Sequence, residues 1–164
     1  MSAEAPTLHM VCGKIAAGKS TLASRLGRSN GTILVAEDAW LEALFADQLS
    51  SLSDYARCSP RLRRIMGPHI SSLLRAGVSV VLDFPANTVE QRGWCRGIFE
   101  AAGASHRLHV LEASDEFCLT RLRARQANGD HPFAVTEEQY RQFARYYEPP
   151  SPEEGFNIMS YAQN

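Results

Sequence analysis

The chain has 164 residues, of which 45% are hydrophobic and 21% are charged. This composition excludes an intrinsically disordered protein. The length is sufficient for a domain that buries a hydrophobic core without the support of bound metal ions or disulfide bonds. The formal net charge is -1 at pH 7, so the overall electrostatic field gives no attraction to nucleic acid or to an anionic membrane. We expect one domain over residues 1–164.

The cysteines and the N-terminal residues favour a cytoplasmic protein. Cys12, Cys58, Cys95 and Cys118 are scattered without a C-x-x-C pair, which argues against a zinc site and against a disulfide framework. Residues 1–6 lack the charged start and apolar core of a signal peptide. No apolar run approaches the roughly 20 residues of a membrane span. We therefore expect reduced thiols, a cytoplasmic location and no membrane partner.

Apolar, strand-like runs alternate with helical stretches along the chain, which is typical of a parallel α/β sheet covered on both faces. The predicted strands span 8–12, 32–36, 78–82, 107–111 and 156–160. The predicted helices span 19–28, 38–47, 60–76, 89–102, 115–128 and 136–147. Ser59 and Pro60 predict the capped start of the third helix, and Gly77 predicts its end.

A phosphate-binding pattern lies between the first predicted strand and the first predicted helix. The stretch 13–21 reads GKIAAGKST and fits G-x-x-x-x-G-K-[ST]. A turn in this position gathers backbone N–H groups and the positive end of a helix dipole around one point, which suits a polyphosphate. Lys19 is expected to reach the β- and γ-phosphates and Ser20 to bind Mg²⁺. Ala16 stands where many kinases carry Gly, and Ala adopts a positive φ less readily.

The whole loop is expected to contact the nucleotide. Its residues are Gly13, Lys14, Ile15, Ala16, Ala17, Gly18, Lys19, Ser20 and Thr21.

Two carboxylates follow the second and third predicted strands. The carboxyl ends of parallel strands meet at one edge of a sheet, so Asp38 and Asp83 should both lie beside the loop. Asp38 is a candidate to accept a proton from an attacking hydroxyl, or to orient that hydroxyl, with a helix cap as its other interpretation. Asp83 is the candidate to orient hydrated Mg²⁺, with a turn residue before Pro85 as the alternative. Glu37 is the weaker catalytic candidate, because its charge also suits a helix N-terminus.

The fifth predicted helix carries arginines ahead of a Gly-containing loop at about 126–135, which we interpret as a lid. Arg121 and Arg125 are four residues apart and share a helix face, while Arg123 points elsewhere. Planar cations neutralise charge on a transferring phosphoryl group. Arg121 and Arg125 are therefore predicted at the ATP site, with a solvated basic face as the alternative. His131 lies in the loop as a candidate substrate contact, although a single loop histidine is more often only exposed.

Together these residues resemble the P-loop small-molecule kinases of the AAA_33, polynucleotide-kinase-like and chloramphenicol-phosphotransferase-like group. The resemblance rests on the loop, on Asp38, and on the stretch DFPANT at 83–88 followed by Arg92. That stretch is also similar to the Asp-Gly-Phe-Pro-Arg segment of adenylate kinase, but the Gly is missing and Ala86 replaces the Arg. The resemblance implies a three-layer P-loop fold with a five-stranded parallel sheet in the order 2-3-1-4-5, ATP as donor, and Asp38 in the base position.

The family layout implies that residues 38–76 bind the acceptor. The candidate substrate contacts are Trp40, Arg57, Arg61, Asn87, Arg92 and His131. The leading hypothesis is an ATP- and Mg²⁺-dependent phosphotransferase acting on a hydroxyl of a metabolite or an antibiotic. One alternative is a kinase of 5′-hydroxyl nucleic-acid ends or of nucleotides; a nucleic-acid strand needs a basic track that the net charge does not indicate. The other is a nucleotide-dependent switch ATPase without a small-molecule acceptor.

Overall fold

A computed structural model describes residues 4–129 and 135–163. All the strand pairs in its single sheet are parallel, and the order β2-β3-β1-β4-β5 confirms the predicted topology. The strands are β1 Thr7–Cys12, β2 Thr32–Ala36, β3 Ser79–Asp83, β4 Ser105–Ala113 and β5 Ile158–Gln163. β4 is longer than predicted at both ends, and β5 begins two residues later than predicted, where Ile158 pairs with Leu108.

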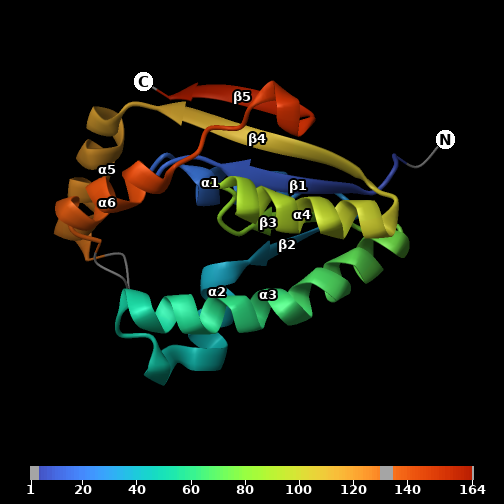
Figure 1. Cartoon of the computed structure of the whole chain (residues 1–164), viewed down its shortest axis with the longest axis horizontal. Helices are drawn as coiled ribbons and strands as arrows, with labels where there is room; N and C mark the ends of the chain where they lie inside the picture. The colour runs from blue at the N-terminus through green and yellow to red at the C-terminus, as the bar shows by residue number, and fades with distance from the viewer. Residues whose placement is uncertain (1–3, 130–134, 164) are drawn as a thin grey trace.

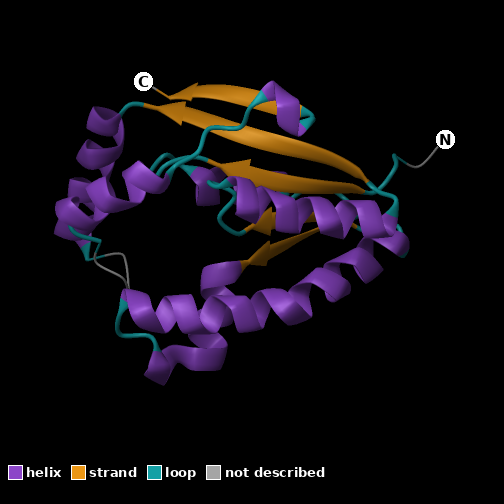
Figure 2. Ribbon diagram, in the orientation of Figure 1, coloured by secondary structure: helices purple, strands orange, loops and turns teal. Residues whose placement is uncertain are grey.

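Helices cover both faces of the sheet and make three layers (Figures 1 and 2). The helices are α1 Lys19–Leu26, α2 Glu37–Phe45, α3 Leu52–Arg75, α4 Val89–Ala102, α5 Asp115–Asn128 and α6 Glu137–Tyr146, with short 3₁₀ turns at Ala46–Gln48 (η1) and Pro152–Glu154 (η2). One core cluster packs α3 and α4 on one face, and a second packs α1, α5 and α6 on the other. Within the described residues, none of these helices is long and apolar enough to cross a membrane.

Strand alternation explains the two clusters. Leu8 and Met10 of β1 belong to the cluster of α3 and α4, whereas Val11 belongs to the cluster of α1 and α5. Successive side chains of a strand point to opposite faces, so a central strand needs apolar residues on both. β1 lies between β3 and β4, which leaves the loop after Cys12 at the point where the chain turns from one half of the sheet to the other. Ligands bind at such a point in open α/β sheets.

Helix α3 begins at Leu52, eight residues before the predicted start at Pro60. The Ser51 hydroxyl accepts a hydrogen bond from the Asp54 N–H and caps the helix. A buried stripe with a spacing of four residues continues through the helix; it consists of Cys58, Leu62, Met66, Ile70 and Leu74. The expectation that Ser59 caps this helix is wrong, because burial of the stripe outweighs the local preference of Pro60 for a first helical position.

Candidate functional site

The loop between β1 and α1 adopts the backbone that phosphate binding needs. Gly18 precedes α1 with φ 102°, and Ala16 has φ 64°. Within the described ranges, Ala16 is the only residue other than glycine with a positive φ. Its methyl group is buried in the cluster of α1 and α5, and this packing holds a conformation that costs an L-residue roughly 1–2 kcal/mol. The loop therefore turns at Ala16 as it would at a glycine.

The Lys19 side chain folds over this loop. Its Nζ donates to the carbonyl oxygens of Gly13 at 2.5 Å and Lys14 at 2.7 Å. Burial lowers the pKa of Lys19 to about 8, against the opposing effect of nearby groups such as Asp83. Two carbonyl oxygens of the loop thus hold the ammonium group beside the loop. When a nucleotide binds, phosphate oxygens can take their place as acceptors of these hydrogen bonds.

The predicted metal residues lie in contact. The Ser20 hydroxyl donates a hydrogen bond to Asp83 Oδ2 at 3.0 Å. Burial raises the pKa of Asp83, the charge of Asp38 raises it further, and the bond from Ser20 lowers it. A hydroxyl and a carboxylate oxygen are donors that suit Mg²⁺, which binds few protein ligands and keeps its water and phosphate oxygens. No group of three or more His, Cys, Asp or Glu side chains suited to a metal occurs within 4–129 and 135–163.

Asp38 lies in the first turn of α2 and is exposed. The register of β2 and β3 pairs Ala36 with Asp83, so both strands end at the same level of the sheet. Asp38 is close enough to act electrostatically on both Asp83 and Glu37, raising the pKa of each. The two carboxylates predicted to work together therefore lie at one edge of the sheet, beside the phosphate loop.

Helix α5 brings its arginines to the same loop. A Cβ atom on Gly18 would lie 3.1 Å from Arg121 Nη1, so this guanidinium lies directly against the turn. Arg125 lies close enough to lower the pKa of Lys19, and burial followed by the charge of Arg121 lowers its own pKa. Arg123 is exposed and pairs with Glu137 at 3.1 Å. His131 and much of the predicted lid at 126–135 fall outside the described residues.

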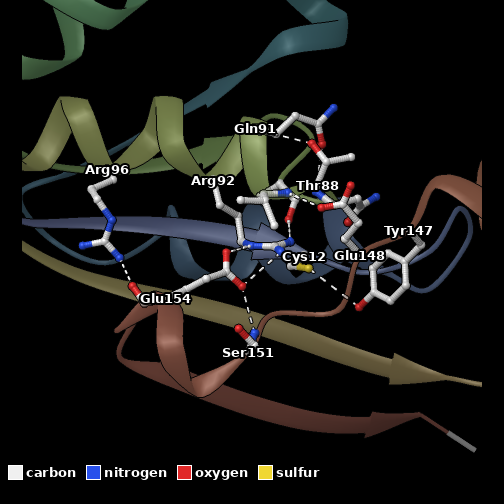
Figure 3. A network of polar contacts seen from close by, with 12 residues as sticks. Cys12, Thr88, Gln91, Arg92, Arg96, Tyr147, Glu148, Ser151 and Glu154 are labelled. Atoms are coloured by element: carbon white, nitrogen blue, oxygen red, sulfur yellow. Dashed lines mark hydrogen bonds and ion pairs between the residues drawn. The ribbon is translucent and has the colours of Figure 1, made fainter.

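Two residues predicted to contact substrate, Asn87 and Arg92, instead hold the phosphate loop in place through hydrogen bonds within the protein. Gly13 N–H donates to Asn87 Oδ1 at 2.9 Å. The Arg92 side chain is 0% exposed: its Nε donates to Glu154 Oε1 at 2.8 Å and its Nη1 to the Ala86 carbonyl at 3.0 Å (Figure 3). Arg92 therefore forms a brace, a buried side chain of α4 that binds both the loop after β3 and η2. Because its guanidinium is fully buried, a substrate cannot reach it.

The acceptor candidates of α2 and α3 lie at the surface of the two helices. Trp40 is exposed, and Arg57 is exposed and pairs with Asp54 at 3.2 Å. Arg61 borders a shallow hollow of about 440 Å³ between α2 and α3. The other residues that line the hollow are Leu44, Phe45, Leu62, Arg64 and Ile65.

Sequence reasoning missed a polar cluster around Glu37. This carboxylate is 2% exposed; it accepts hydrogen bonds from the Tyr55 hydroxyl and, at 3.0 Å, from the Ser59 hydroxyl, and Arg63 Nε lies 3.8 Å away. Burial raises the pKa of Glu37, while Tyr55, Arg63 and Ser59 oppose that rise. The three partners follow one another at intervals of four residues, which places them on one face of α3. The spacing of these three residues could have predicted the cluster from the sequence. The predicted helix began at Pro60, however, and so left Tyr55 and Ser59 outside it.

Comparisons with known proteins place this geometry in a family. Residues 8–150 match the family model described as AAA domain. A crystal structure from Chloroflexus aurantiacus j-10-fl superposes with a TM-score of 0.74 at 22% identity, covering 98% of this chain and 87% of that one. A sugar kinase from Janibacter sp. HTCC2649 has a TM-score of 0.67 at 18% identity, covering 96% and 85%. The APS kinase of Mycobacterium tuberculosis, in complex with AMPPNP and APS, has a TM-score of 0.60 at 20% identity, covering 94% and 88%.

These likenesses show the fold of P-loop kinases. None of the curated proteins matches the chain.

Proposed function

Because this chain belongs to the AAA domain family (AAA_33) and has the fold of P-loop kinases, we propose that it is an ATP- and Mg²⁺-dependent phosphotransferase. It moves the γ-phosphoryl group of ATP to a hydroxyl of a small molecule. The observation that carries the proposal is the contact of Ser20 with Asp83 at 3.0 Å beside the phosphate loop, with Asp38 close enough to raise the pKa of Asp83.

Each residue of the site has a role in the proposed transfer. The acceptor oxygen attacks the γ-phosphorus, the bond to the bridging oxygen of ADP breaks, and Asp38 accepts or orients the proton of the attacking hydroxyl. Lys19, Arg121 and Arg125 stabilise the charge that spreads over the phosphoryl oxygens. Ser20 and Asp83 would hold Mg²⁺, which when bound neutralises charge on the β- and γ-phosphates.

The nucleotide, the location and the partner belong to the same proposal. AMPPNP bound to the APS kinase of this fold supports ATP as the donor. Cys12, Cys58, Cys95 and Cys118 are free and buried, which suits a reducing cytoplasm that also supplies ATP. The partner is then a small-molecule acceptor, and the net charge of -1 gives no support to a nucleic-acid strand.

Transfer of labelled phosphate from ATP to a panel of hydroxyl compounds tests this function. The panel contains metabolites and antibiotics, together with an oligonucleotide that has a 5′-hydroxyl end and a set of nucleotides. We expect one small molecule to gain phosphate, and Asp38→Asn to lower kcat by about 10²-fold or more, since general-base contributions have this size. Glu42→Gln, an exposed change on the same helix α2, should leave kcat unchanged.

Other outcomes would contradict the proposal. Phosphate on the oligonucleotide or on a nucleotide would select the first alternative. Hydrolysis of ATP that only a protein partner stimulates, with no acceptor phosphorylated, would select the switch ATPase.

A further inference from the structure

Two exposed aliphatic side chains border the hollow between α2 and α3. Ile65 of α3 is 65% exposed and Leu44 of α2 is 55% exposed, the highest values among the large aliphatic residues that the structure describes. Both line the hollow of about 440 Å³, which is also lined by the buried Leu62. Trp40, one turn before Leu44 on the same face of α2, is exposed as well. Apolar side chains gathered at the surface in this way mark a site where another molecule binds.

The two sides of the hollow have opposite charge. Residues 37–54, which form α2, η1 and the start of α3, contain no Lys, Arg or His, whereas residues 55–65 of α3 contain no Asp or Glu. Asp47 on the acidic side and Arg61 and Arg64 on the basic side are exposed. None of these three side chains forms an ion pair with another described residue. Their charges are therefore available to a binding partner.

A second copy of the chain fits both the shape and the charge of this surface. In a dimer with two-fold symmetry the same patch of each copy meets itself, so Ile65 or Leu44 of one copy can enter the hollow of the other. The acidic side of each copy then faces the basic side of the other, which brings Asp47 toward Arg61 and Arg64. A partner with a single sign of charge would be repelled by one of the two sides. The net charge of -1 causes little repulsion between copies.

We propose that this chain forms a two-fold symmetric dimer in which α2 and η1 of each copy pack against α3 of the other. The interface is the α2–α3 face, which consists of Trp40, Leu44, Asp47, Arg61, Arg64 and Ile65. Its apolar residues lose contact with water when the copies meet, which supplies the driving force. Its charged residues fix how the two copies are oriented.

The α2–α3 face and the candidate active site lie on different sides of α2. Asp38 and Leu44 are six residues apart, which places them about 120° apart around the helix axis. Figure 1 shows α2 and α3 beside β2, the edge strand opposite β5. Dimerisation is therefore separate from phosphoryl transfer, and its test needs neither an acceptor nor a nucleotide.

Sedimentation equilibrium of the full chain provides the first test. The concentration runs from about 1 µM to about 1 mM, a range that includes the weak association expected of a small interface. We expect the average mass to rise from that of a monomer to that of a dimer. Ile65→Glu should weaken the association about tenfold or more, because the dimer would bury a carboxylate from each copy. Met159→Glu, an exposed apolar residue of the opposite edge strand β5, is the matched control and should associate as the wild type does.

Charge reversal tests the arrangement of the two copies. One variant is Asp47→Arg, and the other combines Arg61→Glu with Arg64→Glu. Either variant alone brings like charges together across the two-fold axis, so we expect each to stay monomeric where the wild type is dimeric. An equimolar mixture restores opposite charges at both contacts and should form a heterodimer, which native mass spectrometry distinguishes by mass. Circular dichroism of each variant shows that it is folded.

Three results would overturn the inference. They are a wild-type chain that remains monomeric up to about 1 mM, an equal loss of association in Met159→Glu and Ile65→Glu, and a mixture of the two charge variants that stays monomeric. A monomeric wild type is then titrated with polyglutamate as a probe. Binding that Arg61→Glu with Arg64→Glu abolishes would assign the basic side of the face to an acidic protein instead of a second copy.

Discussion

At the scale of single residues, the phosphate loop depends on Ala16. The sequence raised the question of whether an alanine could turn the loop, and the structure gives Ala16 a φ of 64° with its methyl group buried. The strain is small because Ala has the shortest side chain that still has a Cβ, and it is offset by packing in the cluster of α1 and α5. A longer or branched residue would not fit both requirements.

Substitutions at Ala16 test this balance. Ala16→Gly should change the free energy of unfolding by less than about 1 kcal/mol, because relief of backbone strain is offset by the greater entropy of glycine in the unfolded chain. Ala16→Val should destabilise the protein and weaken ATP binding by about tenfold or more, because a β-branched residue rarely adopts a positive φ. Urea unfolding and ATP titration measure the two effects. Wild-type ATP affinity in Ala16→Val would show that the loop does not require this conformation.

The lowered pKa of Lys19 predicts that nucleotide binding depends on pH. Burial holds its pKa at about 8, below its ordinary value of about 10.4. Below pH 8 the ammonium is charged and ready for phosphate; above pH 8 the free protein loses this proton, so ATP affinity should fall by up to about tenfold per pH unit. Isothermal titration between pH 7 and pH 10 measures the effect. Lys19→Arg should bind with a flatter profile, and a flat wild-type profile would contradict the assignment.

At the scale of elements, a brace behind the site connects segments far apart in sequence. Arg92 of α4 and Glu154 of η2 are 62 residues apart in sequence, and Arg92 also holds the Ala86 carbonyl of the loop that presents Asn87 to Gly13. Figure 3 shows the Arg92 and Glu154 side chains meeting between α4 and η2. Asn87 is further fixed from the chain before η2, because Glu148 N–H donates to its carbonyl at 2.8 Å. The phosphate loop is thus connected to η2 through Asn87, Ala86 and Arg92.

Removing one partner of the brace should be costly. Glu154→Gln leaves the Arg92 charge buried without its ion pair, so we expect a loss of about 3 kcal/mol in the free energy of unfolding. Faster hydrogen exchange at the Gly13 N–H should accompany the loss, because the loop that carries Asn87 is released. Glu153→Gln, an exposed neighbour, should cost less than about 0.5 kcal/mol. Equal stability of the two variants would show that the pair contributes nothing.

At the scale of the whole molecule, a chain of polar side chains links the centre of the sheet to its edge. His9 of β1 contacts His109 of β4 at 3.0 Å, and His109 contacts the Tyr161 hydroxyl of β5 at 2.9 Å. Burial, followed by the charges of His9 and Arg107, lowers the pKa of His109 to about 4. A histidine in this position stays neutral in the folded protein at a pH where the unfolded chain is protonated.

Acid should therefore destabilise the fold through His109. Its folded pKa of about 4 lies below the unfolded value of about 6.5, so its contribution is complete above pH 6.5 and is lost as the pH falls toward 4, by up to about 3 kcal/mol. Urea unfolding between pH 7 and pH 4 measures this slope. His109→Gln should flatten it, while the exposed His69→Gln should not. An unchanged slope in His109→Gln would assign the acid sensitivity to other groups.

The sequence by itself determined the strands, the loop and the positions of Asp38 and Asp83, because strand periodicity and the meeting of parallel strand ends are local or topological rules. The sheet order was implied only by the resemblance to P-loop kinases, and the strand pairing in the structure confirms it. Tertiary structure decided what depends on distant partners. It moved the start of α3 to Leu52, where burial of a long stripe outweighs a proline signal, and it gave Arg92 an internal partner instead of a substrate. It also turned Arg63 of α3 toward Trp94 of α4, because only the packing of α3 against α4 decides which of the four arginines on α3 becomes covered.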